Sequence, residues 1–72
     1  MVEVFKTNIS KQKQSNQIIV KLNQTFPKYK INFDLEDCDN ILRVENTIGE
    51  IDNKVIIELI TEDGFYIEPL KD

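Results

Sequence analysis

Residues 31–45 read INFDLEDCDNILRVE, and this stretch decides the fold because it encodes two strands joined by a polar turn. Apolar and polar residues alternate over 31–35, which is typical of a strand with one buried face. Residues 36–40 are polar, and 41–45 read as a second strand. We therefore expect an antiparallel hairpin whose buried face carries Ile31, Phe33, Leu35, Leu42 and Val44, with Phe33 at the centre of the core.

The residues before this hairpin predict a strand followed by a helix. Residues 2–6 are short and largely apolar, with Val2 and Val4 expected to face the helices. Ser10 offers a side-chain oxygen that can cap a helix, and Pro27 ends the helical pattern. The apolar positions of this helix recur at helical spacing: Ile18, Ile19, Leu22 and Phe26.

The residues after the hairpin predict a second helix and a last strand. Asp52 is a favourable N-cap residue, and Gly64 is a favourable residue just beyond the C-terminal end. Residues 65–68 then read as a strand, and Pro69 indicates that this strand lies at a sheet edge because proline cannot donate a backbone hydrogen bond.

The order of these elements is β-α-β-β-α-β, which predicts an α+β fold, the ferredoxin-like split βαβ plait. Right-handed crossovers place both helices on one face of a four-stranded antiparallel sheet. The expected edges are residues 28–35 and 65–70. The chain has 72 residues, so we expect a single domain spanning 1–72.

Composition argues against several classes of function. The net charge is −4, which disfavours nucleic acid and anionic membranes as partners. Histidine is absent, so the commonest general base and metal ligand is missing, and we expect neither enzymatic activity nor a cofactor. The sequence shows no signal peptide and no apolar run near the ~20 residues of a membrane span. We therefore expect a soluble, cytoplasmic protein.

Residues 31–65 resemble the heavy-metal-associated domain family, which contains copper chaperones and small metal-binding modules of metal-pumping ATPases. The second strand of that family often reads V-x-V-D-L-E, and residues 31–36 read INFDLE. Its third strand precedes a Ser- or Asp-capped helix ending in Gly-Tyr, where this chain has Asp52 and then Gly64-Phe65. The resemblance implies the plait fold and a relationship to metal-handling modules.

The chain departs from that family in the loop that binds metal. The family signature there is M-x-C-x-x-C, whose thiolates hold Cu(I) or Zn(II). Residues 7–14 read TNISKQKQ, so both cysteines are missing and lysines stand nearby. No metal ligand carries over to any residue, and we expect no tight metal binding.

The acidic turn offers weak metal-ligand candidates, Cys38, Asp37 and Asp39. An alternative function is therefore a metal carrier or metal-transport accessory protein that uses Cys38 and nearby carboxylates. Neighbouring carboxylates raise the pKa of a thiol, and the spacing lacks the glycine of a calcium-binding loop. These observations favour an ordinary solvated turn.

A second weak candidate is an anion site at the start of the first helix, formed by Ser10, Lys11 and Lys13. Backbone N–H groups at a helix start attract anions. The glycine-rich approach of a phosphate loop is absent, which favours an ordinary polar first turn.

The sheet face turned away from the helices is the surface we favour for function. On it we expect Phe5, Ile41 and Tyr66 to form a small apolar patch, with Arg43 on a charged rim. Such a patch is typical of a protein contact. The sequence thus predicts a small non-enzymatic binding or adaptor module, whose partner is another protein or a weakly associating second copy of the chain.

Overall fold

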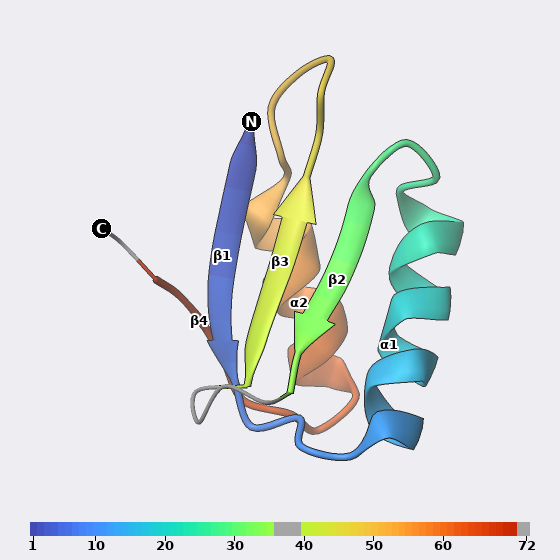
Figure 1. The fold of residues 1–72 in the computed structure, drawn as a ribbon, viewed down its shortest axis with the longest axis vertical. Helices are drawn as coiled ribbons and strands as arrows, with labels where there is room; N and C mark the ends of the chain where they lie inside the picture. The colour runs from blue at the N-terminus through green and yellow to red at the C-terminus, as the bar shows by residue number, and fades with distance from the viewer. Residues whose placement is uncertain (36–39, 71–72) are drawn as a thin grey trace.

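The computed structural model describes residues 1–35 and 40–70, which form one four-stranded antiparallel sheet and two helices (Figure 1). The elements follow one another as β-α-β-β-α-β. Their bounds are β1 Val2–Thr7, α1 Gln12–Thr25, β2 Lys30–Asp34, β3 Ile41–Glu45, α2 Asn53–Glu62 and β4 Ile67–Pro69. The order across the sheet is β2-β3-β1-β4. This is the ferredoxin-like plait, and both the topology and the two edge strands are as predicted.

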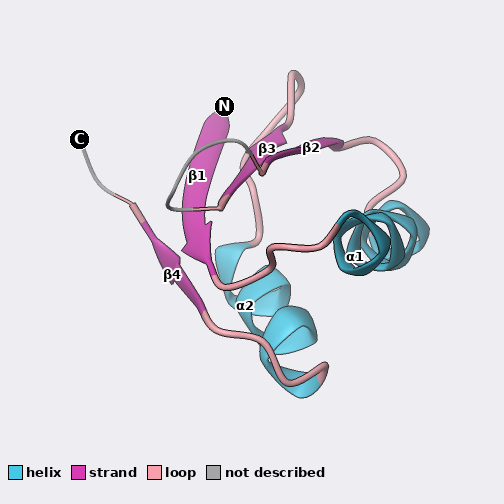
Figure 2. Ribbon diagram, turned by 60° about the horizontal axis from the view of Figure 1, so that its bottom comes forward, coloured by secondary structure: helices cyan, strands magenta, loops and turns pink. Residues whose placement is uncertain are grey.

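Both helices lie on the same side of the sheet, so the opposite face is left open (Figure 2). In Figure 1, α2 lies behind β3, whereas α1 runs along the outer side of β2. A salt bridge of 2.6 Å between Lys21 Nζ on α1 and Asp63 Oδ1, just after α2, links the two helices. No helix within the described residues is long and apolar enough to cross a membrane.

The buried core lies between the sheet and the helices. The hairpin faces are as predicted: Leu42 and Val44 are fully buried, and Ile31 and Phe33 pack against the core. The buried apolar side chains are Phe5, Ile9, Ile18, Leu22, Leu42, Val44, Ile56, Ile60 and Ile67. Phe33 is only half-buried because its strand is an edge, so its predicted central place in the core is wrong.

The predicted facing of β1 is also wrong, because Phe5 belongs to the core. Phe5 is 0% exposed and lies opposite Leu42, whereas Val4 is half-buried and lies opposite the exposed Arg43. The strand continues to Thr7, which is also buried, and Ile9 beyond it is buried as well. Burying an aromatic ring removes more apolar area from water than burying valine, so this alternation is the more stable one.

The predicted helix-end residues are confirmed for α2, and the predicted cap of α1 is wrong. Asp52 caps α2, and its side chain accepts a hydrogen bond from Val55 N at 3.3 Å. Gly64 follows that helix with φ of +88°, a conformation that favours glycine. Ser10 does not cap α1: the N-cap residue is Lys11, which makes no side-chain capping hydrogen bond.

The last strand begins two residues later than predicted. β4 spans Ile67–Pro69 rather than residues 65–68, and Pro69 lies opposite Phe5. The preceding turn is held by Asn8, whose Oδ1 accepts a hydrogen bond from Tyr66 N at 2.8 Å. This contact leaves only a short edge strand, which pairs with the end of β1.

Candidate interaction surface

The open face of the sheet is built from alternate residues of the four strands. The register places three side chains of β1 beside three of β3 and three of β2, with one residue of β4 next to Lys6. We call these residues the open face: Val2, Val4, Lys6, Lys30, Asn32, Asp34, Ile41, Arg43, Glu45 and Glu68. Their alternation follows from the period of two in a β-strand.

Three apolar side chains lie on the open face, and two of them, Val4 and Ile41, lie on neighbouring rows of the sheet. Val4 lies opposite Arg43, and Ile41 lies between Lys6 and Asp34. Both Val4 and Ile41 are half-buried by their neighbours. Together with adjacent residues they line an open hollow of about 420 Å³, whose walls are Val4, Asn32, Phe33, Asp34, Ile41 and Arg43.

The charges on the open face are balanced although the chain is acidic. Among the described residues it carries the cations Lys6, Lys30 and Arg43 and the anions Asp34, Glu45 and Glu68. The register alternates their signs, with Lys30 opposite Glu45 and Lys6 opposite Glu68. Because the charges balance, this face carries no strong long-range field of one sign.

The structure brings only part of the predicted patch together. Ile41 and Arg43 lie on the open face, as expected from their strand. Phe5 is excluded from it, because its side chain points into the core. Val4 takes its place, and the signal in the sequence is that Phe5, Thr7 and Ile9 share one alternation.

Tyr66 stands at the margin of the open face, at the start of β4, and is 51% exposed. Its hydroxyl donates a hydrogen bond to Glu68 Oε2 at 2.6 Å. This hydrogen bond raises the pKa of Tyr66 above its ordinary value of 10.0, with smaller contributions from desolvation and from the charge of Glu68. Because Tyr66 pairs with Asn8 beyond the end of β1, and β1 lies between β4 and β3, Tyr66 does not join Val4 and Ile41.

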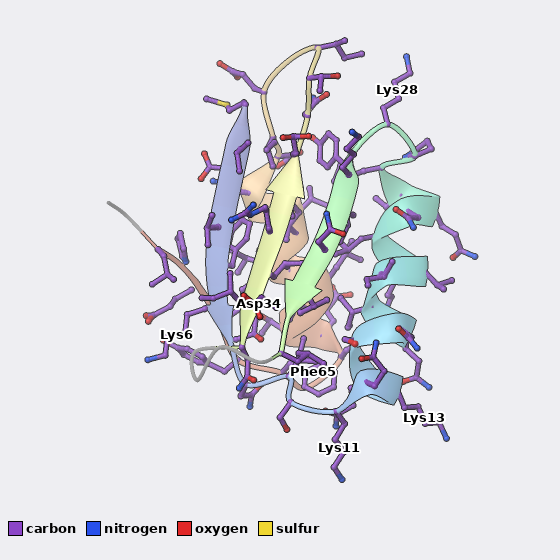
Figure 3. The ribbon with its side chains drawn as sticks, in the orientation of Figure 1. Lys6, Lys11, Lys13, Lys28, Asp34 and Phe65 are labelled. Atoms are coloured by element: carbon purple, nitrogen blue, oxygen red, sulfur yellow. The ribbon has the colours of Figure 1, made fainter. Side chains whose placement is uncertain are left out.

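The predicted anion candidates lie at one end of the molecule (Figure 3). Lys11 and Lys13 are exposed at the start of α1 and point away from the sheet in this view. Ser10 is exposed and makes no helix-capping hydrogen bond. These exposed side chains form a solvated helix start.

The predicted metal-ligand candidates Cys38, Asp37 and Asp39 lie outside the described residues. Within 1–35 and 40–70, no group of three or more Cys, Asp or Glu side chains is arranged to hold a metal ion. The described part of the chain therefore offers no further ligand set, and the metal-carrier alternative rests on the sequence alone.

Comparison of the chain with protein-family models, curated proteins and solved structures gives no match. The likeness of residues 31–65 to heavy-metal-associated domains thus remains a hypothesis that rests on the quoted residues.

Proposed function

We propose that this protein is a small non-enzymatic binding module that recognises a protein partner through the open face of its sheet. One observation carries the proposal: both helices cover the other face, so the open face keeps Val4 and Ile41 at a water-exposed surface amid ordered charges (Figure 2). Protein–protein interfaces commonly have an apolar centre surrounded by a polar and charged rim.

The size and charge of the open face favour weak, selective association. A small domain face falls at or below the ~1,000 Å² of total buried area that stable interfaces usually exceed. Arg43 and Glu45 extend from β3, the strand between β2 and β1, and provide opposite charges on neighbouring rows. Such charges set partner choice more than affinity.

The test is capture of partners by the intact chain under native conditions, with quantitative mass spectrometry of the bound proteins. Ile41→Ser and Arg43→Ala alter the open face, whereas Val20→Ser removes a 56%-exposed side chain of α1 on the other side of the molecule. Circular dichroism confirms that each variant is folded. The proposal predicts that the open-face variants lose a set of proteins that Val20→Ser retains; identical sets for all three variants would refute it.

A further inference from the structure

Strand β2 is a sheet edge whose outer side is unpaired within the described residues. It has five residues, and its inner side pairs with β3 from Lys30↔Glu45 to Asp34↔Ile41. The opposite edge, β4, has three residues and contains Pro69, which lacks a backbone donor. Of the two edges, β2 is therefore the one able to accept another strand.

The direction of the free backbone groups on β2 follows from hydrogen bonds elsewhere in the sheet. Leu70 N donates to Val4 O at 2.8 Å, so Val4 bonds towards β4. Its opposite residue Arg43 therefore bonds away from β1, towards Asn32, because antiparallel strands alternate their bonding direction. It follows that Asn32 points its N–H and C=O inward, and that Ile31 and Phe33 point theirs outward.

The other end of β1 supports the same alternation. Met1 N donates to Asn46 O at 2.6 Å, and Asn46 N donates to Met1 O at 2.9 Å. Odd-numbered residues of β1 thus bond towards β3, while Val4 bonds towards β4. Two independent sets of hydrogen bonds therefore give the same outward direction for Ile31 and Phe33.

A hollow of about 360 Å³ runs along this edge. Its lining residues come from α1 and from both faces of the β2 segment: Gln12, Ser15, Ile19, Asn32, Phe33, Asp34 and Leu35. In Figures 1 and 2, α1 lies outside β2 on the helix side of the sheet, so it extends beyond this edge strand. A fifth strand added at this edge meets outward backbone groups on one side and Ile19 of α1 beneath it.

The edge also carries a charge pattern that specifies the added strand. Lys30 and Asp34 stand at its two ends on the open face, with the half-buried Ile31 and Phe33 between them on the helix face. An antiparallel partner places a cation opposite Asp34, an anion opposite Lys30 and apolar residues opposite Phe33 and Ile31. We propose that β2 binds an extended segment of another protein by strand addition, the segment reading basic–apolar–any–apolar–acidic from its N-terminal end.

The proposed occupant is an isolated segment rather than a second copy of the whole domain. Residues 30–34 of this chain, KINFD, have the required pattern themselves. Two β2 strands paired antiparallel are related by a twofold axis perpendicular to the sheet, which puts both helix layers on the same side. Because α1 lies outside β2 (Figure 1), that arrangement places two α1 helices against each other across the axis, whereas a single extended segment meets only one.

Strand addition goes beyond the proposed function, because it uses the backbone edge of β2 rather than the apolar residues of the open face. A capped synthetic peptide with the sequence of residues 28–35 tests it. Titration into the labelled chain, followed by NMR, is expected to shift the Ile31 and Phe33 amides and to slow their hydrogen exchange. Methylating the backbone nitrogens of the peptide's own Ile and Phe is expected to abolish binding, because these N–H groups face β2. Methylating the nitrogen of the peptide's Asn leaves binding intact, because that N–H points away.

Charge reversal supplies the second arm of the experiment. Asp34→Lys in the chain is expected to weaken peptide binding about fivefold. Replacing the Lys of the peptide's KINFD segment with Asp is expected to restore the affinity. Ile41→Ser leaves peptide affinity unchanged, so failure of the open-face proposal and failure of strand addition are distinguishable. Binding that ignores N-methylation, or a chain that dimerises through β2 in analytical ultracentrifugation, overturns the inference.

Discussion

Phe5 lies directly opposite Leu42 in the β1–β3 ladder, and both side chains are fully buried. This pair fixes which face of β1 meets the helices, because a strand alternates its side chains between two faces. It therefore also places Val4 on the open face beside Arg43. The composition of the open face depends on this one contact.

Phe5→Ala is expected to lower the free energy of unfolding by about 3–5 kcal/mol, because it leaves a cavity in place of a fully buried ring. This loss is comparable to the whole stability of a domain this small. Urea denaturation measures it. Val4→Ala, on the open face, is the matched control and is expected to cost about 1 kcal/mol or less. Equal losses for the two variants would show that the facing of β1 is wrong.

The two helix starts differ in what their cap residues contribute. Asp52→Ala is expected to cost about 1 kcal/mol, because the side chain of Asp52 accepts a hydrogen bond from Val55 N. Lys11→Ala is expected to be neutral or slightly stabilising, since Lys11 makes no capping hydrogen bond and places a cation at the positive end of α1. Chemical denaturation measures the free energy of unfolding of both variants. A larger loss of stability for Lys11→Ala than for Asp52→Ala would contradict the prediction.

The hydrogen bond between Tyr66 and Glu68 predicts a pH dependence. It raises the pKa of Tyr66, so its contribution to stability is complete below the ordinary value of 10.0 and is lost as pH rises through the folded-state pKa. Glu68→Ala is expected to lower the pKa of Tyr66, as followed by NMR of its ring carbon. Glu45→Ala removes a carboxylate that does not contact Tyr66 and serves as the control. An unchanged titration in Glu68→Ala would exclude the hydrogen bond in solution.

The chain is expected to bind neither Cu(I) nor Zn(II) more tightly than about micromolar, because one thiol and no histidine cannot supply the usual set of soft ligands. Competition with a chromogenic chelator under reducing conditions measures the affinity, with Cys38→Ser as the comparison. Stoichiometric uptake that disappears in Cys38→Ser would instead establish the metal-carrier function.

Much of the fold is predictable from the sequence because local signals and topology agree. The hairpin of residues 31–45 has clear alternation, Asp52 and Gly64 mark the ends of a helix, and Pro69 marks an edge strand. With β-α-β-β-α-β order, right-handed crossovers leave few arrangements of the sheet. The observed strand order and the two-layer architecture follow from these signals.

The facing of β1 is harder to predict because Val2, Val4 and Phe5 are apolar at both alternations. Only the buried Thr7, at the end of the strand, and the buried Ile9 beyond it distinguish the two. The candidate surface inherits this ambiguity, so Ile41 and Arg43 were predictable on the open face whereas Val4 was not. The hollow beside β2 depends on how far α1 extends beyond the sheet, which no local pattern encodes.

Binding of protein partners at the open face is tested most sharply by site-specific photo-crosslinking. A photoreactive phenylalanine analogue replaces Val2, which is exposed on the open face, in one chain and Val20, exposed on α1, in another. Each chain is irradiated under native conditions, and covalent adducts are identified by mass spectrometry. Discrete protein adducts are expected from position 2 and are expected to be absent from position 20. Adducts from position 20 alone, or the same adducts from both positions, would contradict it.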